Sequence, residues 1–394
     1  MGSTGMHQTY VYLEETILTL FASTGFHLSK PLRTTLVELI VCLLENNKAH
    51  LSKLGEYLCD VNTDVMASIQ RVRRFLSNPR ISPSATVRPL IMLMRPLLAP
   101  LTEIILIVDR TDWQRRQCHI SILSVAVSYK GRALPLYWMV SGKPGCSSLE
   151  EWKQVLFPVI AALQQMPWLT GRPLHIHVVA DREFASPRLA EWLHMTFAVN
   201  VTFRLKASMY LRGEDTSETK VASLIKAMKK GSRHILHHQM VTRDSTFAMN
   251  VLLTWGHEYE EPLVVATTSP DPTAVDGVYG QRFTIEPMHK DWKSNAFDLE
   301  RTRVTDPKRI ETLLIPIAFA YVFCVLEGEQ KERDGEVRVP PKGKPRMVSL
   351  FLSGLRAISR ALQRENLTLF KAFIRELLQP VFQAWNIQPS TIIH

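Results

Sequence analysis

Two short apolar runs, each ending in aspartate, place the strongest constraint on the fold of this 394-residue chain. They are residues 103–109, EIILIVD, and residues 175–181, HIHVVAD. A continuous apolar run of this length is typical of a strand that is buried on both faces of a sheet. Asp109 and Asp181 are then expected at the C-terminal ends of two buried strands, where active-site residues commonly project from open α/β sheets.

The segments around these runs alternate between strand and helix patterns. After the first strand we expect, in order, strands at 119–128 and 132–140, a helix at 149–166, a strand at 175–181, a helix at 186–194 and a strand at 199–205. Residues 129–131, Tyr-Lys-Gly, predict a hairpin, and Ser186 predicts a helix N-cap. This order resembles the ribonuclease-H-like fold, a mixed α/β sheet flanked by helices. Residues 206–270 contain β-rich runs between polar turns, which predicts an inserted, mostly antiparallel segment.

The pattern divides the chain into four regions. These are a helical region at 1–100, a catalytic domain at 101–327 that includes the β-rich insertion at 206–270, a flexible basic loop at 328–346 and C-terminal helices at 347–394. Within them we expect N-terminal helices at 11–24, 32–44, 52–58 and 65–76, and C-terminal helices at 347–363 and 367–378. The helix at 65–76 carries Arg71, Arg73 and Arg74, a cluster suited to a DNA-binding region. The same cluster also fits a solvated helix end, where the macrodipole favours cations, and the sequence leaves both interpretations open.

Composition narrows the class of partner and the compartment. Lys and Arg exceed Asp and Glu by 47 − 37 = 10, which favours an anionic partner. We find no uninterrupted apolar run of 18 residues and no secretory signal, so we expect no membrane association and a cytoplasmic location. The five cysteines are scattered without a Cys-x-x-Cys pair, which indicates reduced thiols.

Residues 279–293, YGQRFTIEPMHKDWK, collect one carboxylate among several cations. Tyr279, Arg282, Glu286, Lys290 and Lys293 fall within about 80° of each other on a helical wheel. Taken alone, this pattern fits a surface helix with a Glu-Lys pair at i, i+4. It becomes a catalytic pattern if two more carboxylates join Glu286 and the cations hold a polyanion. The proline that follows Glu286 predicts a kink at that glutamate.

Asp109, Asp181 and Glu286 together form a set of three oxygen ligands. This is the hard donor set that Mg²⁺ or Mn²⁺ prefers. Two such ions, ~3.5–4 Å apart, support phosphoryl transfer in known two-metal sites. Asp112 is an alternative to Asp109, ranked second because it lies beyond the expected strand end. The glycine-containing run 142–148 lacks the ending of a P-loop, and we expect a loop near the active site.

Three blocks in this order resemble a known family. The spacing Tyr279-x2-Arg282-x3-Glu286-x6-Lys293 is similar to the Tyr-Arg-Glu-Lys signature of bacterial insertion-sequence transposases with a DDE triad, the insertion-sequence-four family. Residues 108–113, VDRTDW, resemble the block around the family's first aspartate, and residues 179–184, VADREF, the block around its second. The resemblance covers about residues 104–327.

The resemblance implies a DNA transposase that moves an insertion sequence by cut-and-paste. Asp109, Asp181 and Glu286 would be catalytic and would hold two Mg²⁺ or Mn²⁺ ions, while Tyr279, Arg282 and Lys293, with Lys290 as a weaker addition, would contact DNA phosphates. Strand cleavage would proceed through a hairpin and be followed by strand transfer. The partners would be double-stranded terminal inverted repeats and target DNA, bound by a homodimer in a synaptic complex associated with the bacterial nucleoid.

Some relatives place a tryptophan in the strand before the signature helix to trap a flipped base. The matching strand at 262–268 has none, and Trp255 in the preceding strand is a candidate for that role. A core tryptophan at a strand end is the simpler explanation of Trp255. Two alternative functions stay open: a ribonuclease-H-like metal nuclease that does not join strands, and a domesticated DNA-binding protein that no longer catalyses.

Overall fold

The two aspartate-ending runs form neighbouring parallel strands near the middle of a large sheet. The computed structural model describes residues 14, 15, 17–19, 21, 22, 24, 25, 27–59, 64–115, 117–166, 174–213, 217–339 and 347–363. Its core strands are β1 (Glu103–Arg115), β2 (Cys118–Tyr129), β3 (Arg132–Ser141), β4 (His175–Ala180) and β5 (Asn200–Arg204). Within the described residues the strand order is β3-β2-β1-β4-β5-β10-β9-β8-β6-β7. β1, β4 and β5 run parallel, whereas β2 and β3 add antiparallel strands on the other side of β1.

β1 is longer than expected, and this corrects the position of Asp109. The strand does not end at Asp109, because β2 continues to pair with it as far as Arg115. The apolar pattern stops at Asp109 because the outer half of β1 is partly exposed and no longer paired with β4. The predicted hairpin between β2 and β3 is confirmed. Lys130 and Gly131 both have positive φ, as a two-residue type I′ turn requires.

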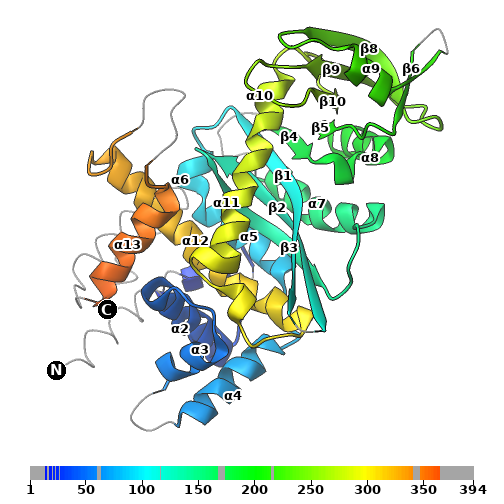
Figure 1. The fold of residues 1–394 in the computed structure, drawn as a ribbon. Coiled ribbons are helices and arrows are strands. Elements are labelled where there is room, and N and C mark those ends of the chain that lie inside the picture. Colours follow the sequence, from blue (N-terminus) through cyan, green and yellow to red (C-terminus); the bar gives the residue numbers. More distant parts are fainter. Residues whose placement is uncertain are drawn as a thin grey trace.

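The insertion extends the core sheet. It comprises β6 (Tyr210–Arg212), β7 (Glu218–Lys220), α9 (Val221–Ala227), β8 (Arg233–Val241), β9 (Ala248–Thr254) and β10 (Leu263–Thr267). All of its strand pairs are antiparallel, as expected, and β10 pairs with β5 to continue the same sheet. This part of the chain forms the upper end of the molecule in Figure 1.

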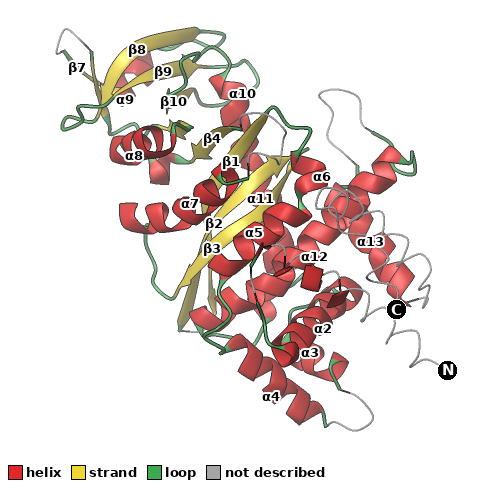
Figure 2. Ribbon diagram, turned by 180° about the vertical axis from the view of Figure 1, so that it is seen from behind, coloured by secondary structure: helices red, strands yellow, loops and turns green. Residues whose placement is uncertain are grey.

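Helices cover the sheet and carry the third carboxylate. α7 (Leu149–Gln164) packs on β2 and β3, and α8 (Pro187–Phe197) packs on β5, with Ser186 capping it as predicted. A segment with changing helical pitch crosses the sheet: α10 (Val275–Gly280), a 3₁₀ turn (Gln281–Thr284), α11 (Ile285–Lys290) and a π-helical turn (Asp291–Asn295). Figure 1 shows α10 and α11 lying across the front of the sheet, and Figure 2 shows the same layers from behind. α10 packs on β4, β5, β9 and β10, whereas α11 packs on β1 and β3.

α12 (Pro307–Arg333) is the central helix of the remaining layer. It packs against β3 and against α2 (Lys30–Asn46), α4 (Val65–Leu76), α5 (Pro83–Leu93) and α13 (Leu350–Gln363). Among the described helices, α12 alone is long and apolar enough to cross a membrane, and 94% of that apolar stretch is buried inside the protein. It therefore has the character of a core helix. The other described N-terminal helices are α3 (Leu51–Tyr57) and α6 (Arg95–Leu98).

Some expected boundaries differ from the structure. α12 continues to Arg333, so the loop expected from Gly328 begins six residues later. Gly328 suits this helix because its missing side chain lets the backbone of Leu350 in α13 approach closely. Residues 340–346, the expected helix at 367–378 and part of the one at 11–24 lie outside the described residues.

Candidate active site

The register of the parallel strands sets the positions of the two aspartates. The last paired position between β1 and β4 is Val108 with Ala180. Asp109, still within β1, and Asp181, directly after the end of β4, come next, so their backbones leave this parallel ladder at the same level. The sheet thereby brings together two carboxylates that are 72 residues apart in the sequence.

Asp109 lies in a largely buried position. Only 17% of its side chain is exposed, and burial raises the pKa of its carboxyl group to about 6. The Arg282 guanidinium and the backbone of Arg110 oppose this rise, whereas the charges of Asp181 and Glu286 add to it. The rise is thus mainly an effect of burial, with the neighbouring carboxylates as smaller contributors.

The α10–α11 segment brings the third carboxylate and a cation to this place. Arg282 Nη2 donates to Glu286 Oε1 at 2.8 Å, and Arg282 Nη1 lies 3.9 Å from Asp109 Oδ2. Tyr279 Oη donates to Asp181 Oδ1 at 3.3 Å. Each acid of the expected triad is thus in contact with the expected Tyr-Arg pair. Burial and the charge of Asp181 raise the pKa of Tyr279 to about 12, so the phenol stays a hydrogen-bond donor at neutral pH.

The expected kink at Glu286 takes a different form. Glu286 itself is helical, within α11, and the change of pitch lies in the preceding 3₁₀ turn. Pro287 lacks the backbone N–H that would bond to the carbonyl of Phe283, and its ring disfavours regular helix in that turn. The geometry keeps Arg282 buried while 57% of the Glu286 side chain remains exposed.

His289 is a site residue that the sequence analysis missed. Its Nδ1 lies 3.9 Å from Asp109 Oδ2, and its Nε2 lies 2.9 Å from Ser124 Oγ on β2. Burial, with a smaller contribution from Lys293, lowers the pKa of His289 to about 3, so the imidazole is neutral. Its position three residues after Glu286 and seven after Arg282 puts it on the same helical face, a spacing that could have revealed it.

The donor set fits a hard divalent cation, although the described residues hold no preformed metal cage. Among the described parts of the chain, no group of three Asp, Glu, His or Cys side chains is already close enough to hold a metal ion. Arg282 lies between the carboxylates and supplies positive charge there. Three carboxylates, one of them buried with a raised pKa, are the oxygen donors that Mg²⁺ or Mn²⁺ prefers. The Glu286 side chain, which is 57% exposed, has room to turn toward the other two carboxylates.

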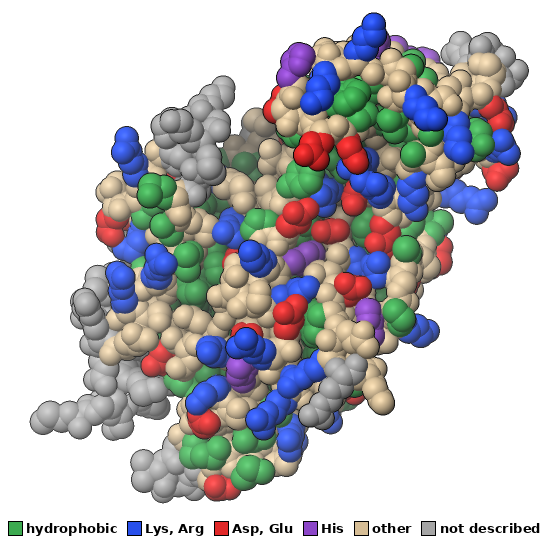
Figure 3. Space-filling model, viewed as in Figure 1, with side chains coloured by type: hydrophobic (Ala, Val, Ile, Leu, Met, Phe, Trp, Pro, Cys, Tyr) green, Lys and Arg blue, Asp and Glu red, His purple; other side chains and the backbone are tan. Residues whose placement is uncertain are grey.

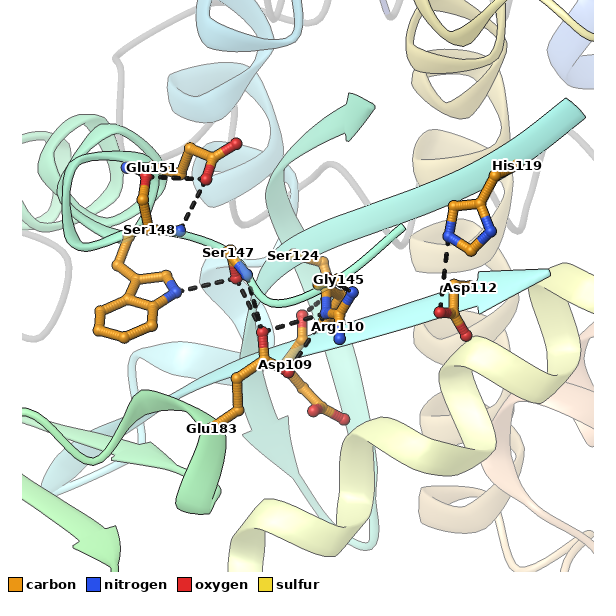
Figure 4. A network of polar contacts seen from close by, with 11 residues as sticks. Asp109, Arg110, Asp112, His119, Ser124, Gly145, Ser147, Ser148, Glu151 and Glu183 are labelled. Atoms are coloured by element: carbon orange, nitrogen blue, oxygen red, sulfur yellow. Dashed lines mark hydrogen bonds and ion pairs between the residues drawn. The ribbon is translucent and has the colours of Figure 1, made fainter. Parts of the chain in front are cut away.

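The alternative ligand, Asp112, points elsewhere. An odd offset along β1 places it on the opposite face of the strand from Asp109. Half of its side chain is exposed, and its carboxylate lies 3.7 Å from His119 Nε2. Figure 4 shows this pair away from the contacts around Asp109 and Arg110. The geometry therefore favours Asp109 over Asp112.

The loop at 142–148 contacts residues that follow each of the two aspartates. Arg110 Nη1 donates to Gly145 O, and Glu183 accepts from Ser147 N at 3.1 Å and from Ser147 Oγ at 3.0 Å. These contacts connect Arg110, which follows Asp109, and Glu183, two residues after Asp181, to the same loop (Figure 4). Neither Arg110 nor Glu183 was singled out from the sequence.

Lys290 and Lys293, the other residues of segment 279–293 that we expect to contact DNA, lie toward its C-terminal end. Lys290 is exposed on α11. Lys293 lies in the π-helical turn, where its Nζ donates to the backbone oxygen of Asp112 at 2.8 Å and pairs with Glu300 at 3.3 Å. Lys293 therefore ties this turn to the outer half of β1.

The three N-terminal arginines differ in their surroundings. Arg71 is paired with Glu38 and donates from Nε to Thr35 Oγ1 at 3.1 Å, which engages it inside the helical region. Arg74 is exposed, and its Nε lies 3.4 Å from the Gln70 carbonyl oxygen. Arg73 lines a hollow of about 350 Å³ together with Arg303 and Arg309. The side chain of Arg71 is thus the least available of the three.

A second hollow of about 410 Å³ adjoins the first through Arg303. Arg115, at the end of β1, and Arg301 also line it, and Arg115 Nη1 is buried without a hydrogen-bond partner among the described residues. Figure 3 shows Lys and Arg side chains gathered on this face, over α3, α4 and the segment that follows α11. The two hollows form a basic surface outside the carboxylate site, which we call the arginine groove.

Trp255 lies apart from this constellation. It follows β9, which β10 and β5 separate from β4 in the sheet. Its indole Nε1 donates to Tyr259 O at 3.0 Å, and its ring packs against the hydrophobic core. These contacts favour a structural tryptophan over a base-stacking one.

The fold and the candidate site together are consistent with one class of enzyme. A large mixed sheet, with two aspartates on adjoining parallel strands and a glutamate from a helix across them, is consistent with the ribonuclease-H-like core of DDE transposases. The family model described as the transposase DDE domain matches residues 100–323, and the chain belongs to this family. A search of curated proteins found no match. Family membership makes the protein a transposase, an enzyme that acts on the phosphodiester bonds of DNA.

Proposed function

We propose that the protein moves an insertion sequence of the insertion-sequence-four type by cut-and-paste transposition. One observation supports the proposal most directly: Asp109 and Glu286 both lie near the Arg282 guanidinium, and Asp181 accepts a hydrogen bond from Tyr279. Cleavage of one strand at each transposon end, a hairpin intermediate and strand transfer are the steps that the Tyr-Arg-Glu-Lys resemblance implies.

The side chains of the site have separable roles in this proposal. Asp109, Asp181 and Glu286 would hold two Mg²⁺ or Mn²⁺ ions, which would supply Lewis-acid activation of the attacking oxygen and stabilisation of the leaving oxygen. Arg282 binds the scissile phosphate, since a guanidinium donates two parallel hydrogen bonds to phosphate oxygens. Tyr279 orients Asp181 through its phenol, and neutral His289, bonded to Ser124, limits the rotation of the Asp109 carboxylate.

The arginine groove offers a path for the duplex beyond the site. β1 rises ~3.3 Å per residue, so the six residues from Asp109 to Arg115 span roughly 20 Å. The phosphates of one DNA strand rise by ~3.4 Å per nucleotide along the helix axis, so a duplex whose axis follows β1 covers roughly six base pairs over this distance. We propose that Arg115, Arg303 and Arg73 contact phosphates there, and that Lys290 and Lys293 contact the backbone nearer to the cleavage point.

We propose the following roles for the regions of the chain. Residues 1–100 bind DNA and residues 101–327 catalyse, with 206–270 as an insertion, while α13 packs on α12 in the helical layer. We further propose a homodimer in the synaptic complex and a nucleoid-associated location in the bacterial cytoplasm.

A cleavage and joining assay tests the proposal. The substrate is a labelled duplex carrying the inverted repeats that flank the coding region, with Mg²⁺ or Mn²⁺ added. We expect single-strand nicks and a hairpin product from the wild type, and joined product when a precleaved end and target DNA are supplied. Asp181→Asn and Glu286→Gln should abolish cleavage while end binding in a gel-shift assay stays within about twofold of wild type, because neither substitution removes a positive charge.

Each alternative function gives its own result. Cleavage without joining of a precleaved end would indicate a metal nuclease. End binding with no cleavage by the wild type in either metal would indicate a DNA-binding protein that no longer catalyses. Normal cleavage by Asp181→Asn would remove that residue from the triad.

A further inference from the structure

Asp109 and Asp181 lie just beyond the backbone hydrogen bonds that join their strands. The described pairing of β1 with β4 ends at Val108 and Ala180. Asp109 is still held by β2, opposite Ser124, whereas Asp181 begins a short 3₁₀ turn, Arg182–Phe184. The spacing between the two carboxylates therefore depends on side chains that cross from one segment to the other.

A largely buried ion pair makes that crossing. Arg110 Nε lies 3.1 Å from Glu183 Oε1 and 3.2 Å from Glu183 Oε2. The two side chains are only 17% and 19% exposed. Alternation along β1 places Arg110 on the opposite face from Asp109, so the pair lies behind the carboxylate site.

The loop at 142–148 forms hydrogen bonds with both side chains of this ion pair. Glu183 accepts from the backbone and the hydroxyl of Ser147, and Arg110 donates to Gly145 O. Trp152 Nε1 donates to Ser147 Oγ at 2.9 Å, and the Trp152 ring packs on Phe184 at 5.3 Å between centroids. Figure 4 shows Arg110 and Glu183 turned toward each other with this loop beside them. The carboxylate of Glu183 is thus fully engaged by donors from two directions.

We propose that Arg110 and Glu183 are positioning residues that fix the spacing of Asp109 and Asp181 for divalent-cation binding. This inference rests on the proposed function. A site for a small divalent cation needs its ligands near ideal geometry, and groups that orient metal ligands typically change metal affinity or activity 10–100-fold when they are removed. Arg110 and Glu183 act here through the backbone segments that carry the two aspartates.

Mn²⁺ binding by the full-length, DNA-free protein tests the inference. Electron paramagnetic resonance measures free Mn²⁺ during a titration, and thermal unfolding of the metal-free protein is recorded for each variant. We expect Glu183→Gln to weaken Mn²⁺ binding roughly 10-fold. Ser147→Ala, which removes one donor to Glu183 and leaves the ion pair, should weaken it by a smaller factor. Glu150→Gln breaks an exposed ion pair with Lys153 on α7 and should bind Mn²⁺ as wild type does.

The outcomes separate the inference from the proposed function. If Asp181→Asn loses Mn²⁺ binding while Glu183→Gln and Ser147→Ala bind it as wild type does, the inference is overturned and the carboxylate site stands. A lower unfolding temperature of Glu183→Gln with unchanged Mn²⁺ affinity also overturns it, because a purely structural pair behaves in that way. If the wild type binds no Mn²⁺, the proposed function fails and the inference fails with it.

Discussion

Asp109 and Asp181 each follow the last residue that pairs in the parallel ladder between β1 and β4, so their carboxylates leave the sheet at one level. The ladder sets the level at which the two backbones leave it, and the Arg110–Glu183 ion pair joins the segments just beyond that level. Glu286 reaches the same place on a helical segment that crosses from β10 to β3. The sheet thus fixes two acids, and a helix of irregular pitch presents the third.

Replacing Arg282 should change metal binding and catalysis in opposite directions. Its guanidinium lies near Asp109 and is bonded to Glu286, where it competes with any added cation. We expect Arg282→Gln to bind Mn²⁺ several-fold more tightly than wild type in a resonance titration, because positive charge is removed from beside the carboxylates. Strand cleavage should fall, since the phosphate loses its partner. Arg243→Gln, at the far end of the sheet, is the control, and weaker Mn²⁺ binding by Arg282→Gln would contradict the account.

The arginine groove should appear in the salt dependence of DNA binding. Each phosphate contact contributes about −0.9 to the slope of log affinity against log salt concentration. Arg303→Ala should weaken binding of a duplex and reduce the magnitude of the slope by about 1. Arg71→Ala should leave the slope unchanged and lower stability instead, because Arg71 is paired with Glu38 inside the helical region. An unchanged slope for Arg303→Ala would exclude a phosphate contact there.

The crossing of α12 and α13 depends on the absence of a side chain at Gly354. A Cβ at this position would overlap the carbonyl oxygen of Cys324 and approach the backbone of Gly328. We expect Gly354→Ala to reduce the free energy of unfolding by on the order of 2–4 kcal/mol, measured by urea denaturation. Gly277→Ala is the matched control, since a Cβ there meets no atom within 4 Å. It should be neutral or stabilise by up to about 1 kcal/mol. Equal stabilities of the two variants would show that the helices are not tightly packed.

Asp291 should make stability depend on pH between about 4 and 7. Burial raises the pKa of its carboxyl group to about 6, although the Arg132 guanidinium, 2.7 Å away, opposes the rise. As pH rises from 4, the carboxyl ionises first in the unfolded chain, so the folded state holds more protons and the free energy of unfolding falls. Relative to Asp291→Asn, the wild type should lose on the order of 2–3 kcal/mol between pH 4 and pH 7. Denaturant unfolding of both proteins at pH 4 and pH 7 measures this change. If the wild type instead became more stable relative to Asp291→Asn as the pH rises, the prediction would be contradicted.

The acids of the site could be predicted because each leaves a local signal. Asp109 and Asp181 end apolar runs, and Glu286 stands at a fixed spacing from Tyr279 and Arg282. The predicted end of β1 at Asp109 was wrong because the outer half of this strand pairs with β2, a partner that the strand's own residues do not reveal.

The contacts that support the site could not be predicted, because they join distant residues. Arg110 meets Glu183 across 73 positions, and Arg71 meets Glu38 across 33. An arginine that is paired inside the fold has the same local sequence signature as one that faces solvent. The pairing of β10 with β5 likewise joins strands that are separated in the sequence by the whole insertion.

The most direct test of the central claim is a crystal structure of the protein with Mn²⁺, located by anomalous diffraction. The account predicts anomalous peaks about 2.0–2.3 Å from carboxylate oxygens of Asp109, Asp181 and Glu286, with Arg282 displaced from Glu286. Peaks bound by other side chains, or no peaks at these carboxylates in crystals that contain Mn²⁺, would contradict it.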